Sequence, residues 1–201
     1  MFVQVIEGHV QDPQRVREGL DQWVRDLSPS AQGWLGTTAG VTDDGQFVAM
    51  ACFDSPEAAR RNSDRPEQGR WWNSMSSNFT GEPVFHDCPD CFSAERGQSN
   101  AHFVQVIKGH VRDADRIHAL SDQAEPMIAR ERPEILGDLV ALDPSGDFVE
   151  AVYFTDEPSA REGERKPMPD ELKKLFDEEM SLTDDMSYLD LRQVWLYSPR
   201  Q

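Results

Sequence analysis

The chain has 201 residues, of which 38% are hydrophobic and 28% charged, and its formal net charge at pH 7 is −17. This composition is typical of a soluble globular protein, and no apolar run approaches the roughly 20 residues that a membrane-spanning helix needs. A surface this acidic repels phosphate groups, so we expect neither nucleic acid nor an anionic membrane as a partner.

The chain contains three cysteines: Cys52, Cys88 and Cys91. A small, odd number of cysteines argues against a disulfide framework. The first residues lead directly into an expected strand, without the basic and long apolar regions of a secretory signal. We therefore expect a cytoplasmic protein.

A tandem repeat organises the sequence. The stretch FVQVIEGHVQDPQRV, from Phe2 to Val16, returns as FVQVIKGHVRDADRI, from Phe103 to Ile117, at an offset of 101 residues. Further residues match at the same offset, among them Gly36/Gly137, Gly45/Gly146, Phe53/Phe154 and Pro66/Pro167. The chain is therefore predicted to be a duplication of one structural unit of about 100 residues.

The first half predicts a strand, a helix, two strands, a helical region and a last strand. Asp12-Pro13 is a typical helix start, Asp43-Asp44-Gly45 is typical of a tight turn, and Asp64-Arg65-Pro66 interrupts the second helical region. The expected elements are a strand at 2–6, a helix at 13–27, strands at 34–41 and 47–53, a helical region from 56 to 80 and a strand at 84–92.

The second half predicts the same order. The expected elements are a strand at 103–107, a helix capped by Asp113 with Pro126 inside it, a hairpin of strands at 137–142 and 148–154, a helix around 172–180 and a strand at 188–196. We expect the acidic run 177–179 to be a solvated helix face. The domain prediction is repeat 1 at 1–92, a small polar linker at 93–101 and repeat 2 at 102–201.

The order βαββαβ is that of the ferredoxin-like unit. Both faces of the strand at 47–53 are apolar, so both are expected to be buried, one under helices and the other against a second unit. We therefore predict an α+β fold in which two tandem ferredoxin-like repeats pack as an intramolecular pseudo-dimeric α/β barrel. A monomer is expected, and pairing of two chains through a free sheet edge is the alternative.

The segment FDSPEAARRNSDRPEQGRWW, from Phe53 to Trp72, has an aromatic strand end followed by Ser-x-Glu-Ala and a broken helix. In this it resembles the antibiotic-biosynthesis-monooxygenase-like group of the dimeric α/β-barrel superfamily, here in a fused two-repeat form. The resemblance implies a ligand pocket between the sheet and the helices of a unit. It also implies one of several functions: cofactor-independent oxygenation of phenols, haem binding or degradation, isomerisation, or a non-catalytic stress role.

A haem pocket of the related haem-degrading type would need a histidine on the second helix of a unit. None of the five histidines lies there; they are His9, His86, His102, His110 and His118. The sequence also contains no phosphate loop and no nucleophile–base motif. We therefore expect no cofactor.

Candidate ligand contacts lie in the first repeat. Asn62 and Arg65, at the helix break, could orient an oxyanion or belong to a solvated turn. Trp72 aligns with Lys173, so the fold does not require an aromatic residue there; it is a candidate pocket wall, or it packs on the other repeat. Gln4 and Gln105 lie mid-strand among apolar residues, either as pocket amides or in a structural hydrogen bond made twice.

The stretch HDCPDC places His86, Cys88 and Cys91 close together. A Cys-x-x-Cys pair supplies at most two metal ligands, and no second Cys/His pair exists, so we expect no metal and interpret the thiols as part of a closing strand. His86 is the candidate acid/base that would deprotonate a phenol.

The family resemblance, taken with these candidate residues, implies a cofactor-independent monooxygenase-like enzyme acting on a small, largely apolar aromatic molecule. The alternative is a non-catalytic small-molecule-binding or stress-response module. The repeats diverge at Asn62/Gly163, Arg65/Lys166 and Trp72/Lys173, so at most one repeat keeps a given set of site residues.

Overall fold

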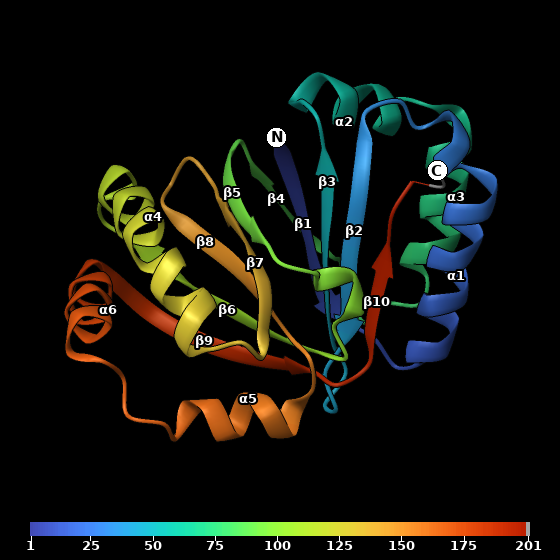
Figure 1. The fold of residues 1–201 in the computed structure, drawn as a ribbon. Helices are drawn as coiled ribbons and strands as arrows, with labels where there is room; N and C mark the ends of the chain where they lie inside the picture. The colour runs from blue at the N-terminus through green and yellow to red at the C-terminus, as the bar shows by residue number, and fades with distance from the viewer. Residues whose placement is uncertain (200–201) are drawn as a thin grey trace. The chain divides into compact units, whose positions relative to one another are not determined.

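The structure, a computed structural model, describes residues 1–199 and contains two compact α+β units (Figure 1). The first unit comprises Met1–Asp90 together with the segment from Gln193 onward, and the second comprises Cys91–Arg192. The predicted α+β fold with two ferredoxin-like halves is confirmed, and each antiparallel sheet has five strands, one more than the four expected in each repeat.

The first unit contains β1 (Phe2–His9), α1 (Pro13–Asp26), η1 (Ser28–Ser30), β2 (Trp34–Val41), β3 (Gln46–Phe53), α2 (Pro56–Ser63), α3 (Pro66–Ser76), β4 (Val84–Cys88) and β10 (Val194–Tyr197). Its strand order is β10-β2-β3-β1-β4. The expected interruption of the second helical region is confirmed, because α2 ends before Asp64 and α3 begins at Pro66.

The second unit contains β5 (Asp90–Glu95), η2 (Gln98–Asn100), β6 (Phe103–Val111), α4 (Ala114–Glu131), β7 (Ile135–Leu142), β8 (Asp147–Phe154), α5 (Glu157–Glu164), α6 (Asp170–Leu182) and β9 (Thr183–Leu191). Its strand order is β5-β7-β8-β6-β9. The two orders match strand for strand, which is the structural form of the sequence repeat.

The fifth strand of each sheet comes from the other half of the sequence. β10 follows β9 along the chain but pairs with β2, with Trp195 opposite Ala39. β5 follows β4 along the chain but lies beside β7 in the second sheet. The stretches 84–92 and 188–196, each expected to be one strand, are therefore each divided between two sheets.

Pro89 explains one of these divisions. A proline has no N–H to donate to a strand ladder, so β4 ends at Cys88 and β5 starts at Asp90. The segment expected to be a linker, 93–101, contains the end of β5 and the short helix η2.

The same local chemistry starts the helices of both units. Asp12 accepts hydrogen bonds from the backbone N–H groups of Gln14 and Arg15 at 3.1 and 3.2 Å, and Asp113 accepts one from Arg116 at 3.0 Å. These caps satisfy N–H groups that have no partner within the helix. The helix starts predicted at Asp12 and Asp113 are thereby confirmed.

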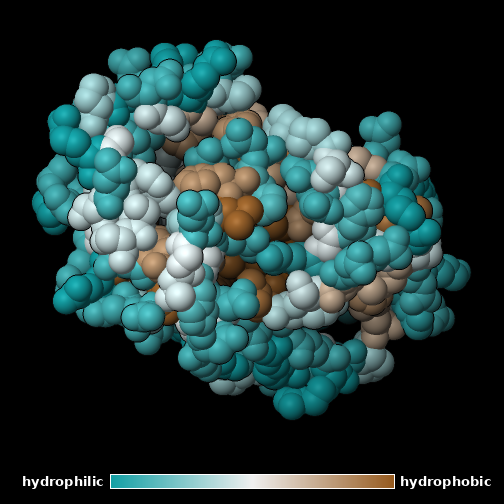
Figure 2. All heavy atoms as spheres, turned by 180° about the vertical axis from the view of Figure 1, so that it is seen from behind, coloured by the Kyte–Doolittle hydropathy of each residue, from teal (hydrophilic) through white to brown (hydrophobic). Residues whose placement is uncertain are grey.

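The surface visible in Figure 2 is largely hydrophilic, with hydrophobic residues confined to limited patches. This agrees with the high charge of the sequence. Among residues 1–199, no helix is long and apolar enough to cross a membrane.

The pairing of β10 with β2 in the sheet of the first unit leads to a testable prediction about stability. Trp195, which is 4% exposed, belongs to the same hydrophobic cluster as Val16, Leu20 and Phe47 of the first unit. We expect Trp195→Ala to lower the free energy of unfolding by about 3–5 kcal/mol, because it empties a large buried site. Chemical denaturation measures this loss, with Leu35→Ala on the exposed side of β2 as a control that should change little. A loss below about 1 kcal/mol for Trp195→Ala would contradict the assignment of β10 to this core.

Candidate functional site

The second unit contains a cavity of about 800 Å³ between its sheet and the helices α4, α5 and α6. This volume lies within the range of roughly 300–1,000 Å³ that is typical of small-molecule sites. Most of the wall is apolar, and its larger members are Ile107, Ile128, Phe148, Val152, Leu172 and Phe176. The cavity lies where the family resemblance places a ligand pocket, in the second repeat.

The corresponding space in the first unit measures only about 70 Å³. Three indole rings fill it: the ring centroid of Trp23 lies 5.0 Å from that of Trp34 and 6.3 Å from that of Trp71. At the repeat offset of 101, their counterparts are the smaller residues Ala124, Ile135 and Leu172, and all three line the large cavity. Loss of the indoles therefore contributes to the open space in the second unit.

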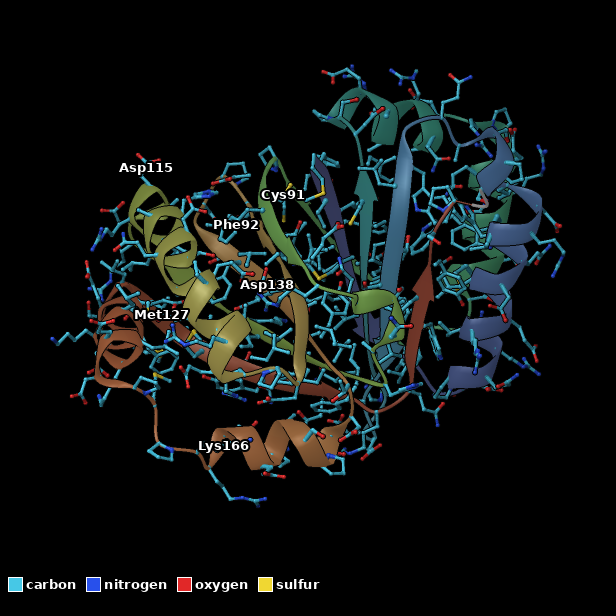
Figure 3. All side chains as sticks on the ribbon, in the orientation of Figure 1. Cys91, Phe92, Asp115, Met127, Asp138 and Lys166 are labelled. Atoms are coloured by element: carbon cyan, nitrogen blue, oxygen red, sulfur yellow. The ribbon has the colours of Figure 1, made fainter. Side chains whose placement is uncertain are left out.

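Three carboxylic acids extend into this cavity: Asp138 from β7, Glu150 from β8 and Glu179 from α6. Figure 3 shows Asp138 on β7 near α4. Asp138 Oδ1 accepts a hydrogen bond of 2.8 Å from the backbone N–H of Ala94. The carboxyl groups of Glu150 and Glu179 form no hydrogen bond or ion pair with any residue of the described chain. Their repeat counterparts are Thr37, Ala49 and Asn78, none of which is acidic.

Burial changes the proton affinity of these acids. Burial raises the pKa of Glu150 to about 8, and the negative charges of Glu179 and Asp138 act in the same direction. Burial also raises the pKa values of Glu179 and Asp138, although the N–H of Ala94 opposes this at Asp138. Glu150 therefore keeps its proton at neutral pH and exchanges it near pH 8, which suits a general acid or base.

A positive charge also reaches the cavity, from Arg132 at the end of α4. The Arg132 guanidinium pairs with Glu134, and this pair lies over Gly163, where an added Cβ would overlap both side chains. The counterparts in the first unit are Ala31, Gly33 and Asn62. The absence of a side chain at position 163 therefore makes room for the Arg132–Glu134 pair.

Arg161 of α5 lines the same cavity. It pairs with Glu164 at 2.7 Å and with Asp190, and its guanidinium lies 5.3 Å from the ring centroid of Phe103. Asp190 also accepts a hydrogen bond of 3.2 Å from Gln105 Nε2. Most of the charge of Arg161 is thus balanced by carboxylates that surround it.

The structure brings together only some of the residues that the sequence singled out. Gln4, Asn62 and Trp72 line the 70 Å³ space of the first unit. Asn62 Oδ1 is buried without a hydrogen-bond partner, and Trp72 packs against Phe85 with ring centroids 5.0 Å apart. Gln105 is the one predicted site residue that lines the large cavity.

Arg65 and His86 lie elsewhere. Arg65 Nη2 donates to the carbonyl oxygen of Leu27 at 3.2 Å, beside the end of α1. The register of β1 and β4 pairs Val5 with His86 and Gln4 with Asp87, so His86 lies on the sheet face opposite to Gln4. There its Nε2 lies 3.7 Å from Glu7 Oε2.

The hydrogen bond of the strand glutamines is made twice. Gln4 Nε2 donates to Asp87 Oδ1 at 2.9 Å, as Gln105 does to Asp190 at 3.2 Å. Because the same hydrogen bond occurs in both units, it favours a structural role for the two amides.

The sequence interpretation missed Asp138, Glu150 and Glu179. Glu150 alternates with Phe148 and Val152 on a strand face that is apolar in the first repeat. The glutamate stands at the repeat position of Ala49, and an acidic residue on this face could have indicated a site from the sequence alone. The expectation that residues 177–179 form a solvated face is wrong for Glu179, because this side chain lines the cavity.

The cavity residues do not suit haem. No histidine lines the cavity, and the three acids disfavour an anionic ligand such as a haem propionate. Among residues 1–199, no group of histidine, cysteine, aspartate and glutamate side chains is arranged to hold a metal ion.

No protein-family model matches the chain, and no curated protein matches it. Solved structures are similar over nearly the whole length. A provisionally assigned monooxygenase from Lactobacillus acidophilus has a TM-score of 0.76 at 12% identity, covering 98% of this chain and 96% of that one. One from Fusobacterium nucleatum has a TM-score of 0.73 at 10% identity, covering 98% and 94%.

An anthrone oxidase-like protein has a TM-score of 0.64 at 9% identity, covering 100% of this chain and 91% of that one. The chain has the fold of these monooxygenase-like proteins. This confirms, at the level of fold, the resemblance predicted from residues 53–72. At such low identity the similarity shows the fold alone, so the chemistry must be argued from the cavity.

The repeat comparison predicts how to close the cavity. We expect Ala124→Trp, which restores the residue of the first repeat, to weaken binding of the neutral apolar dye Nile red at least about tenfold because the indole occupies the site. Fluorescence titration measures the dissociation constant. Gln123→Trp on the exposed face of α4 is the matched control and should leave dye binding unchanged. Equal binding by both variants would show that the dye binds elsewhere.

The raised pKa of Glu150 predicts a pH-dependent loss of stability. Between about pH 4.5 and 8 the unfolded chain releases this proton while the folded chain retains it, so the free energy of unfolding falls as the pH rises. Glu150→Gln cannot ionise and is expected to be more stable than the wild type by about 1–3 kcal/mol at pH 8.5, with no such gain at pH 4. Urea denaturation at both pH values measures this; a gain independent of pH would contradict it.

Proposed function

We propose that the protein is a cofactor-independent monooxygenase-like enzyme whose working site is the cavity of the second unit. Its substrate is a small, largely apolar aromatic molecule with an acidic C–H or O–H group. The observation that carries this proposal is Glu150, a half-buried glutamate in a cavity of about 800 Å³, whose carboxyl group has a pKa raised by burial and no protein partner.

In the proposed reaction, ionised Glu150 takes a proton from the substrate. A carboxylate whose pKa is near 8 is a stronger base than an ordinary glutamate, and is better matched to a phenol or an activated ring CH₂ group. The apolar walls exclude water from the resulting anion, and Arg132 supplies a positive charge on the same cavity wall.

The substrate anion then donates electrons to dissolved O₂. For an activated ring CH₂ group, one oxygen atom becomes the new carbonyl oxygen, and the other leaves as water with the two hydrogens of that carbon. The oxidant is O₂ and the reductant is the substrate, so the reaction balances without a further electron donor.

The reaction class is suggested by proteins of the same fold. Two of the similar structures are provisionally assigned monooxygenases and a third is described as anthrone oxidase-like. The site itself is inferred from this chain's own residues.

We also infer that the protein acts in the cytoplasm as a monomer. Within residues 1–199, Cys52, Cys88 and Cys91 form no disulfide bond, as a reducing compartment permits. Each sheet obtains its fifth strand from within the chain, so neither sheet needs a second chain for its completion.

Oxygen uptake with anthrone as the substrate tests the proposal. The wild-type rate, after subtraction of the spontaneous reaction, is expected to rise with pH to a plateau above about 8, as Glu150 ionises. Glu150→Gln is expected to lower the rate at least about 100-fold. Glu171→Gln, an exposed residue of α6, is the control and should retain the wild-type rate.

Two outcomes would contradict the enzyme assignment. Equal rates for Glu150→Gln and the wild type would remove Glu150 from the chemistry. Binding of anthrone without oxygen uptake by the wild type would favour the alternative, a non-catalytic small-molecule-binding module.

A further inference from the structure

The cavity of the second unit carries an excess of negative charge. Five acidic side chains line it, but only two basic ones, Arg132 and Arg161. Both arginines have carboxylate partners of their own, Arg132 in Glu134 and Arg161 in Asp190 and Glu164. No arginine or lysine of the described chain forms a salt bridge with Asp138, Glu150 or Glu179. The charge of Arg96 favours the ionised form of Asp138, but Arg96 is itself paired with Glu125.

These three acids gather at one end of the cavity. They also line an adjoining space of about 80 Å³, whose other walls include Val111, Ile117, Val140, Leu142 and Phe92. Neither arginine lines that space. Figure 3 labels Phe92 on β5 and Asp138 on β7, the neighbouring strands that contribute to this end. The cavity is therefore polarised, with unpaired acids at an apolar end and balanced ion pairs elsewhere.

We infer that the substrate of this site is a hydrophobic amine, whose protonated nitrogen lies among Asp138, Glu150 and Glu179 while its ring system contacts the apolar walls. The inference rests on the proposed function, because it names the substrate class of the same site. An organic cation is favoured over a metal ion, because no group of these side chains within residues 1–199 has the arrangement of a metal site.

The physical reason is the cost of burying like charges. A carboxylate away from water needs a counter-charge, and three within interaction distance of one another oppose each other's ionisation. A protonated amine offers up to three N–H donors and one positive charge, so it relieves both costs. An anionic ligand of the same shape would add a further repulsion.

The apolar part of the cavity wall suits a bulky ring system. Phe176, Met180 and Tyr188 line the cavity and remain 45%, 37% and 54% exposed, which places its opening beside them. Met168 and Met186 also line it. Methionine side chains adapt to irregular apolar shapes, so this wall can accept ring systems of different outline.

Amine binding also has a consequence for Glu150. The groups that face it are Asp138 from β7, Glu179 from α6, Arg132 beyond α4, Arg161 and Glu164 from α5, and Asp190 from β9. A bound ammonium group favours the ionised form of Glu150, so the bound substrate lowers the pKa of this residue and increases the fraction of it that is ionised at neutral pH. Binding therefore releases a proton, and affinity for the amine is expected to increase with pH between about 6 and 8.

Three anthracene probes of similar shape test the inference on the full chain: 9-anthracenemethylamine, 9-anthracenemethanol and 9-anthracenecarboxylate. Anthracene fluorescence reports binding at pH 7.5. The amine is expected to bind at least about tenfold more tightly than the alcohol, and the carboxylate most weakly. Asp138→Asn and Glu179→Gln are each expected to reduce the preference for the amine at least about threefold. Glu171→Gln, which removes a charge from the exposed side of α6, should leave the preference unchanged.

Equal affinity of the amine and the alcohol for the wild type would overturn the inference, whether or not the variants fold. A preference that survives in both Asp138→Asn and Glu179→Gln would also overturn it. The proposed function is tested separately. A clear preference for the amine without oxygen uptake with any anthrone would support the amine-binding site and contradict the enzymatic function. Oxidation of neutral anthrone without any preference for the amine would support the enzymatic function and contradict the amine-binding site.

Discussion

The space between a five-stranded sheet and its helices is the constraint on which the other properties of this protein depend. Such a space must be filled by side chains or remain as a cavity. In the first unit Trp23, Trp34 and Trp71 fill it with indole rings, and only about 70 Å³ remains. In the second unit Ala124 and Leu172 are too small to do so, and about 800 Å³ is open. The two copies of the duplicated unit therefore differ, because one has a packed core and the other encloses a large cavity.

The charges of the second unit follow from this difference. In a packed core an acidic residue at position 150 would be buried without a partner at high cost, whereas beside a cavity it can serve a ligand. Asp138 and Glu179 reach the same space, while the Arg132–Glu134 pair occupies the place left free by Gly163. Smaller side chains at a few positions and acidic side chains at others therefore distinguish the second repeat from the first, and together they form a large acidic cavity that the first repeat lacks.

Most of the fold was predictable from local sequence, but the large cavity of the second unit was not. Helix starts at Asp12 and Asp113, the turns before Phe47 and Phe148, and the break at Pro66 are short-range signals, and each was confirmed. The choice of the first repeat as the site depended on Trp72 and Asn62, which are polar or aromatic and easily noticed. The large cavity of the second unit is marked instead by small side chains at positions where the first repeat has tryptophan. Such a substitution forms no recognisable sequence motif.

The sequence by itself determined the duplication, the βαββαβ order and the acidic surface, because these depend on residue identity and on spacing along one chain. Only the tertiary structure decided that β10 completes the sheet of the first unit and β5 that of the second, since strand partners are chosen by long-range packing. It also decided which residues surround empty space. Asp138, Glu150 and Glu179 are separated by many residues along the chain, and they meet because two strands and a helix bring them to one cavity, where the exclusion of water changes their proton affinity.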